Sequence, residues 1–322
     1  MKNRDDVIDI AKAIGILLMI LGHCNGLPHL LRNFIFSFHM PLFFIFSGYF
    51  YKPKSVKDIF IRGTDQLVKP YLITSFFCIL LCIIAGRYAL AKEKMIGVLM
   101  SNGGLPLEMF GANLPYIGPI WFLLALFWCK IFYAYLNQKT NHCLFYSFII
   151  STIALIVVKY IVNLPFGILT GFCGMVFYGM GDFWKNKMGG VLKTPYFIVG
   201  LFVWAFCVWK GRLELAAFEC KFYPIAMFAA FIGTYATYLV SKHIPDFLHS
   251  AFLWIGQNTL LILCYHTVCW VVLLDTKIYL FLPNAIELNA FSSSVLMSAL
   301  SLGLPILHTM LFKHIKRAGY SR

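Results

Sequence analysis

Apolar runs long enough to cross a bilayer recur from one end of the sequence to the other, and this feature limits the fold more than any other. Of the 322 residues, 60% are hydrophobic and 12% are charged, and the mean hydropathy is +0.78. A soluble globular protein carries roughly twice that charged fraction. A single segment that crosses a bilayer has to be a helix, because only a helix bonds its own backbone groups. The sequence therefore predicts an all-α polytopic membrane protein, a single membrane-embedded domain over residues 1–322 that contacts membrane lipids.

We expect about ten transmembrane helices, each from an apolar run of spanning length. The expected spans are 7–27, 33–51, 70–86, 118–136, 144–161, 167–184, 195–210, 222–240, 251–274 and 290–312. The connections on one side, together with both terminal segments, hold 16 of the 27 Lys and Arg residues. The other side holds seven, which are Arg32, Arg87, Lys92, Lys94, Arg212, Lys221 and Lys277. Because cytoplasmic connections collect positive charge, both termini are expected in the cytoplasm.

The formal net charge of +14 has the same origin, with attraction to anionic lipid as a second contribution. Nucleic acid is therefore not an expected partner. The ten Cys are scattered and show no zinc-binding spacing, so no metal is expected either. The longest connection on the outer side, 87–117, contains a Gly- and Pro-rich stretch that predicts an irregular loop. This loop could act as a lid over a binding site or as a plain connector.

Lys12 and His23 lie 11 residues apart in the first expected span, so a helix presents both on one face, about 16 Å apart along its axis. Ionisable groups inside a membrane are costly, and Asp9 lies one turn from Lys12, where it can pair with the ammonium group. With a cytoplasmic N-terminus, Lys12 is expected near the inner surface and His23 in the outer half of the membrane.

His39 is the polar residue in the aromatic stretch "FSFHMPLFFIFSG", at the outer end of the second expected span. Its depth should match that of His23, and Pro41 is expected to kink the helix close by. Each histidine alone could be a core residue bonded to a neighbouring helix. Together with Lys12, the two imidazoles favour the wall of a polar cavity.

Weaker site candidates occur farther along the chain. Trp121 opens the fourth span, where a tryptophan of the membrane interface is the alternative explanation. Asn258 and His266 lie in the ninth span, and a structural role is the alternative for both. Arg62 and Lys69 belong to the cytoplasmic connection after the second span, where topology accounts for basic residues but a phosphate-rich ligand could also use them.

The Lys12-x10-His23 pattern resembles the R/K-x10-H signature of the acyltransferase-3 family. Three further landmarks occur in the family's order: "FHMPLFFIFSG" at 38–48, "IWFLLALF" at 120–127 and "IGQNTLLILCYH" at 255–266. The resemblance covers nearly the whole chain, and its bare ten-helix form looks most like the fucose 4-O-acetylase branch.

This resemblance implies transfer of an acyl group, usually acetyl, from cytoplasmic acyl-CoA to a hydroxyl of a cell-envelope carbohydrate or glycolipid. The implied location is the bacterial inner membrane, and the implied donor is acetyl-CoA. His23 would be the catalytic histidine with His39 as its partner, and Lys12, Arg62 and Lys69 would bind the coenzyme. Trp121, Asn258 and His266 are then candidates for the acceptor side.

A different class of protein uses the same residue types. A secondary transporter or exporter of a polar or lipid-linked substrate could employ buried His and Lys as a proton relay. Such folds commonly have broken helices at matching positions of two repeated halves. The sequence shows no such pairing, which favours the acyltransferase.

Overall fold

The computed structural model describes residues 5–103, 107–109, 112–160, 164–211, 213–214, 219–220, 223–281 and 287–319. Within these ranges the regular secondary structure is helical except for two short antiparallel hairpins. One pairs β1 (Leu107–Met109) with β2 (Ala112–Leu114), and the other pairs β3 (Leu213–Glu214) with β4 (Glu219–Cys220). Arg4, which precedes the first predicted span, and the basic residues Arg212 and Lys221 lie outside the described residues.

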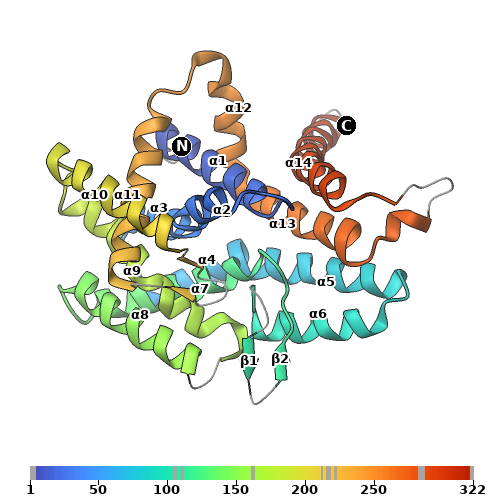
Figure 1. Cartoon of the computed structure of the whole chain (residues 1–322), viewed down its shortest axis with the longest axis horizontal. Coiled ribbons are helices and arrows are strands. Elements are labelled where there is room, and N and C mark those ends of the chain that lie inside the picture. The colour runs from blue at the N-terminus through green and yellow to red at the C-terminus, as the bar shows by residue number, and fades with distance from the viewer. Residues whose placement is uncertain are drawn as a thin grey trace.

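The helices are arranged as Figure 1 shows, with α1, α2 and α3 in the centre and the later helices around them. Their bounds are α1 (Asp6–Gly22), α2 (His29–Phe36), α3 (His39–Tyr49), α4 (Val56–Gly63), α5 (Lys69–Ile84), α6 (Tyr88–Met100), α7 (Trp121–Asn137), α8 (Cys143–Tyr160), α9 (Ile168–Asn186), α10 (Thr194–Lys210), α11 (Tyr223–Ser241), α12 (Asp246–Gln257), α13 (Thr259–Trp270) and α14 (Ala290–Gly319). Two π-helical turns, η1 (Thr64–Val68) and η3 (Val271–Asp275), continue α4 into α5 and extend α13. Two 3-10 turns, η2 (Pro165–Gly167) and η4 (Ile278–Phe281), complete the set.

Every expected span overlaps a helix or a pair of consecutive helices. In the described part of the chain, six segments are long and apolar enough to cross a bilayer, and α12 with α13 and η3 makes a seventh if their 73° bend lies within one span. The six are 29–49, 56–84, 143–160, 165–186, 223–241 and 290–312. The all-helical membrane class is thereby supported, whereas the ten-span topology and the cytoplasmic termini stay predictions.

Two segments differ from the sequence-based expectation. The connection 87–117, predicted to lie on the outer side, contains the helix α6, because 88–100 is rich in the strong helix formers Ala, Leu, Lys, Glu and Met, and the Gly-rich part begins only after it. The ninth span breaks at Asn258, whose φ of −114° and ψ of 19° end α12 and start α13.

The second expected span is interrupted between α2 and α3, one turn before the predicted site at Pro41. Phe38, with φ −147° and ψ −19°, leaves the helical region there. Pro41 therefore falls in the first turn of α3, where its missing N–H has no helical partner to lose.

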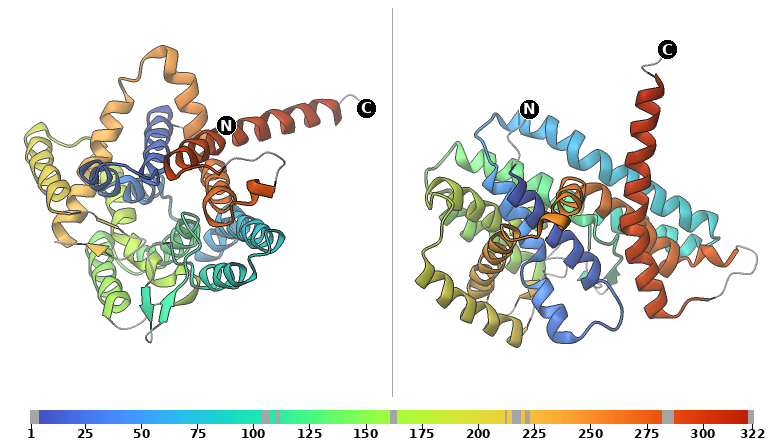
Figure 2. Two further views of the ribbon diagram at one scale, coloured as in Figure 1. Left: turned by 45° about the vertical axis from the view of Figure 1, so that its right-hand side comes forward. Right: turned by 90° about the horizontal axis from the view of Figure 1, so that it is seen from above.

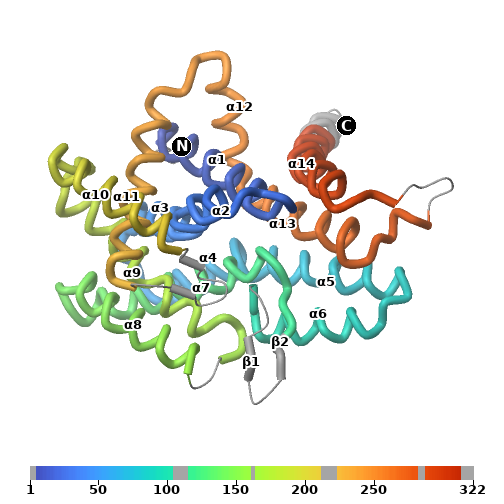
Figure 3. The backbone as a smooth tube through the Cα atoms, viewed as in Figure 1, coloured from blue at the N-terminus to red at the C-terminus, as the bar shows by residue number. Residues whose placement is uncertain are grey.

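Peripheral helices carry apolar side chains on their outer faces, as expected for surfaces that meet lipid tails. On α5 these include Leu72, Ile73, Phe76 and Phe77, each about half exposed or more. Figure 2 shows that α14 projects away from the other helices at its C-terminal end, and Figure 3 shows α1, α2 and α3 in the middle of that view.

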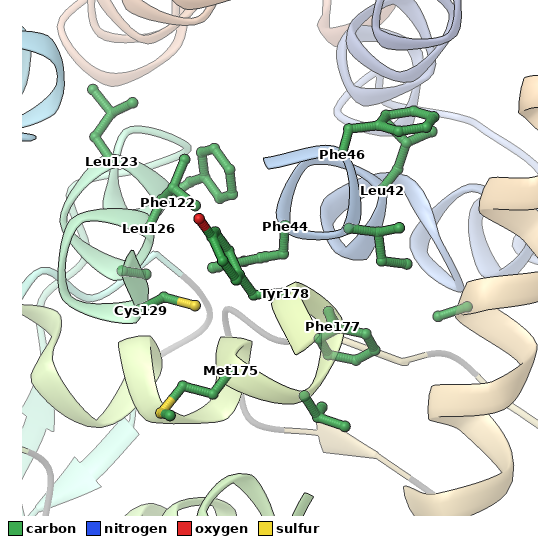
Figure 4. Close-up of a cluster of buried hydrophobic side chains, with 14 of the residues drawn as sticks. Leu42, Phe44, Phe46, Phe122, Leu123, Leu126, Cys129, Met175, Phe177 and Tyr178 are labelled. Carbon is green, nitrogen blue, oxygen red and sulfur yellow. The ribbon is translucent and has the colours of Figure 1, made fainter. Parts of the chain in front are cut away.

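The interior is filled by side chains from α3, α7 and α9 (Figure 4). The labelled members of this cluster are Leu42, Phe44, Phe46, Phe122, Leu123, Leu126, Cys129, Met175, Phe177 and Tyr178. Because α3 packs in this cluster along most of its length, the position of His39 at its first residue is held by the core.

Two glycines let the backbones of α3 and α9 touch. A Cβ atom at Gly48 would lie 1.9 Å from the carbonyl oxygen of Tyr178, and one at Gly181 would lie 1.9 Å from that of Ile45. Small residues that permit such close approach are a known device of helix packing in membranes. These contacts fix α3 against α9 with little freedom.

We therefore expect Gly48→Ala to destabilise the protein by about 1–3 kcal/mol, because the helices must separate to admit a methyl group. The measurement is the apparent melting temperature of the detergent-solubilised protein. Gly303→Ala is the matched control, since a Cβ there meets nothing within 4 Å. Equal melting temperatures for Gly48→Ala and the wild type would contradict the close packing.

Candidate active site

His23 ends the first helix. It is the C-cap residue of α1, and its Nδ1 lies 2.7 Å from the carbonyl oxygen of Met19 one turn earlier. A carbonyl oxygen only accepts hydrogen bonds, so Nδ1 carries the hydrogen of the neutral ring. The hydrogen-bond network thus assigns Nε2 as the lone-pair nitrogen of His23.

His39 begins α3 and bridges the break before it. Its Nδ1 lies 2.9 Å from the carbonyl oxygen of Ile35 in α2, and its side chain is buried. The same reasoning gives an Nδ1–H ring with Nε2 as acceptor. Phe36 lies between the two histidines, with its ring centroid 6.0 Å from that of His23 and 4.9 Å from that of His39.

His266 is the imidazole in ring contact with His23, at a centroid distance of 5.4 Å. Its Nδ1 lies 3.0 Å from Ser301 Oγ, and that hydroxyl lies 2.6 Å from the carbonyl oxygen of Met297. Because Ser301 donates its only hydrogen to Met297, its oxygen accepts from the Nδ1–H of His266. The Nε2 of His266 is buried and has no hydrogen-bond partner.

The three histidines therefore share one tautomer, and each has a basic Nε2. Trp270, one turn beyond His266 on α13, stands against two of them. Its ring centroid is 5.5 Å from that of His23, at an interplanar angle of 86°, and 6.3 Å from that of His266. The result is a compact group of two imidazoles and an indole at the C-terminal end of α1, with His39 behind Phe36.

A cavity of about 240 Å³ lies alongside α1 and approaches this group. From α1 it is lined by Lys12, Ile16 and Met19, which lie on one face of the helix, and His23 follows Met19 by one turn on that face. The predicted common face of Lys12 and His23 is thereby confirmed. The other lining residues are Met40, Phe43, Phe46, Ser47, Phe50, Leu67, Phe122, Leu123, Leu126, Thr259, Leu260 and Leu263.

The cavity is polar at the Lys12 end and apolar along its walls. Lys12 Nζ lies 2.5 Å from Oδ1 of the buried Asp9, so the predicted pairing is confirmed. The wall from α13 runs through Leu260 and Leu263, and the next turn brings His266. Two helices thus lead from the ion pair toward the histidines.

Arg62 and Lys69 do not line the cavity. Both side chains are exposed, and Lys69 pairs with Asp65 at 2.5 Å. They flank the π turn η1, which contributes Leu67 to the cavity wall. Their place is therefore on the surface next to the cavity.

Trp121 and Asn258 are held in structural contacts. The Trp121 side chain is 3% exposed and is covered by Gly103, where a Cβ would lie 1.6 Å from its ring. A lipid-interface position does not describe such a buried ring. The Asn258 side chain donates from Nδ2 to the carbonyl oxygen of Trp254 at 2.7 Å and stabilises the bend that brings Thr259 to the cavity.

Three residues of this region escaped the sequence reasoning: Trp270, Ser301 and Asp275. For Trp270 the sequence did offer a signal, because it follows His266 by four residues and so lies on the same helix face. The other two act through contacts between segments far apart in sequence, for which the sequence offers no spacing. In the described residues, no group of three His, Cys, Asp or Glu side chains could hold a metal ion.

Comparison with known proteins identifies the class. The Acyl_transf_3 family model, described as an acyltransferase domain, matches residues 5–310. The chain therefore belongs to the acyltransferase-3 family of membrane acyltransferases, as the motifs indicated. The nodulation protein NolL of Sinorhizobium fredii (strain NBRC 101917 / NGR234) is 28% identical over 136 residues, 38% of this chain and 34% of NolL. The match thus spans about a third of that relative's length. No solved structure matches the chain.

Proposed function

We propose that this acyltransferase transfers an acetyl or similar short acyl group from cytoplasmic acyl-CoA to a hydroxyl of a cell-envelope carbohydrate or glycolipid. We place it in the bacterial inner membrane. The observation that carries the proposal is the cavity that runs along the Lys12, Ile16 and Met19 face of α1 toward His23. The family membership, rather than a transporter fold, supports reading this cavity as a reaction site.

The dimensions suit an acyl-CoA that enters from the Lys12 end. Lys12 and His23 are about 16 Å apart along the helix, comparable with the reach of an extended pantetheine arm. Lys12 would meet a phosphate or carbonyl oxygen of the donor, exchanging part of its pairing with Asp9. Arg62 and Lys69, exposed beside η1, would meet the nucleotide phosphates outside the cavity.

The chemistry assigned to His23 is general-base catalysis. Its Nε2 takes the proton of the acceptor hydroxyl while the hydroxyl oxygen attacks the thioester carbonyl carbon. The carbon–sulfur bond then breaks, and the imidazolium returns the proton to the leaving thiolate. The apolar cavity walls exclude water, which limits wasteful hydrolysis of the thioester.

Neighbouring residues would orient the two substrates. The Nε2 of His266, buried beside His23, can accept a hydrogen bond from the acceptor sugar, and His39 can do the same from the other side of Phe36. Trp121 and Asn258 would act on the acceptor side indirectly. Trp121 would position the segment at Gly103, and Asn258 would hold the bend between α12 and α13. If His23 instead carries the acyl group itself, the kinetics would be ping-pong.

The experiment for this proposal replaces His23 by Ala in the purified, detergent-solubilised protein. Acyl transfer from acetyl-CoA to envelope carbohydrate should fall by roughly 10²–10⁴-fold, the usual contribution of a general base. His243→Ala is the matched control, because His243 is exposed and follows α11 far along the chain. Normal transfer by a folded His23→Ala protein would remove this residue from the mechanism.

The donor assignment predicts that Lys12→Ala weakens acetyl-CoA binding about tenfold, whereas Lys12→Arg retains it because charge and reach are kept. Lys12→Ala also leaves the buried Asp9 carboxylate unpaired, so Lys12→Ala/Asp9→Ala serves as the folded comparison. Calorimetric titration with acetyl-CoA measures the affinities. If the double variant binds acetyl-CoA with wild-type affinity, Lys12 does not contact the donor and serves only as the ion-pair partner of Asp9.

A further inference from the structure

A buried ion pair joins the outer connection to the end of α13. Lys94 Nζ, on α6, lies 2.8 Å from Oδ2 of Asp275, the last residue of η3. The Lys94 side chain is 4% exposed and that of Asp275 is 11% exposed. Removing two charges from water costs several kcal/mol per ion, and replacing such a pair by apolar residues is often neutral or stabilising. Stability alone is therefore a weak explanation for this pair.

Lys94 is also held by Tyr116, in the segment that follows the β1–β2 hairpin. The Tyr116 ring lies 4.6 Å from Nζ in a cation–π contact, and the Tyr116 carbonyl oxygen lies 3.5 Å from the same atom. Gly97, one turn after Lys94, also lies against the Tyr116 backbone. The ammonium group thus ties α6, residue 116 and η3 together.

Asp275 also forms a hydrogen bond with Trp270. Its second carboxylate oxygen, Oδ1, accepts from the indole Nε1–H of Trp270 at 3.2 Å. The two residues are five apart, and between them the backbone forms the π-helical turn η3, closed by Thr276 N bonding to the Val271 carbonyl oxygen. Single π turns of this kind occur frequently at functional sites.

Trp270 in turn contacts both His23 and His266 through its ring. A continuous series of contacts therefore runs from Lys94 through Asp275 and Trp270 to the proposed base. Lys277, two residues after Asp275, pairs instead with the exposed Glu287.

We propose that Asp275, buried against Lys94, is a positioning residue whose Oδ1 acceptor fixes the Trp270 indole as a rigid wall and so sets the orientation of His23. The inference rests on the proposed function for the role of His23. Lys94 and Asp275 touch no substrate in this scheme. Asp275 supplies the hydrogen-bond acceptor that holds Trp270, and Lys94 neutralises its buried charge.

Two double variants separate this role from plain structural support. Lys94→Met/Asp275→Asn removes both charges but keeps an Oδ1 acceptor for Trp270. Lys94→Met/Asp275→Leu removes the charges and the acceptor together. Since neither variant leaves an unpaired buried charge, both should fold. We expect the Asn variant to keep kcat within about threefold and the Leu variant to lose roughly 10- to 100-fold, as for a small misplacement of a catalytic group.

The Leu variant should change kcat while the KM for acetyl-CoA stays within about twofold, because the Lys12 end of the cavity is untouched. Trp270→Phe, which lacks the N–H, should reproduce this loss. Lys277→Met/Glu287→Gln is the control, because it neutralises the exposed pair on the same side and should leave kcat unchanged. Wild-type kcat in the Leu variant, or equal losses in the Asn and Leu variants, would overturn the proposal.

A second readout does not depend on catalysis. The fluorescence of Trp270 is obtained as the difference between each protein and its Trp270→Phe version. The measured quantity is the quenching of this fluorescence by acrylamide. Quenching should rise in the Leu variant and stay at the wild-type level in the Asn variant, and the same quenching in both would overturn the positioning role. An inactive wild-type protein would refute the proposed function, whereas the quenching result would still decide whether the Asp275 acceptor holds Trp270.

Discussion

Each of the three histidines, His39 and His266 buried and His23 partly buried, uses its Nδ1–H to bond an acceptor that the fold holds in place: the Met19 carbonyl, the Ile35 carbonyl and the Ser301 hydroxyl. A buried N–H without a partner is costly, so these bonds decide which nitrogen carries the hydrogen. The consequence is a set of Nε2 lone pairs on residues that adjoin the cavity-lining residues Met19, Met40 and Leu263 in the chain. The free Nε2 lone pair of each histidine therefore follows from the hydrogen-bond acceptors that the fold places at Nδ1 rather than from a neighbouring charge.

Departures from regular helix occur where the site needs polar groups. The break at Phe38 lets His39 bond back to α2, the bend at Asn258 brings Thr259 to the cavity, and the π turn η3 brings Asp275 under Trp270. In an apolar environment such breaks are tolerated where other protein groups satisfy the freed backbone. Here the side chains of His39, Asn258 and Thr276 bond the carbonyl oxygens of Ile35, Trp254 and Val271 beside these departures.

The sequence was sufficient for features that depend on periodicity within one segment. Apolar runs predicted helices at every expected span, and the 11-residue spacing put Lys12 and His23 on one face with Asp9 as partner. It was insufficient for contacts between segments: His266 beside His23, Ser301 behind His266, and Lys94 with Asp275. It also missed α6, because the Gly- and Pro-rich stretch that follows led the connection 87–117 to be predicted as an irregular loop, and the interface position that it offered as the alternative for Trp121 does not fit the burial of that ring.

The central claim is that acyl-CoA occupies the cavity with its acyl end at His23. A photoreactive acyl-CoA with a diazirine on the acyl chain, crosslinked to the purified protein and mapped by mass spectrometry, tests it most directly. Labels should fall on Met19, Leu263 and the His23–His266 group, and excess acetyl-CoA should suppress them. Labels confined to exposed faces such as those of α5 or α14, or labelling that acetyl-CoA does not suppress, would contradict it.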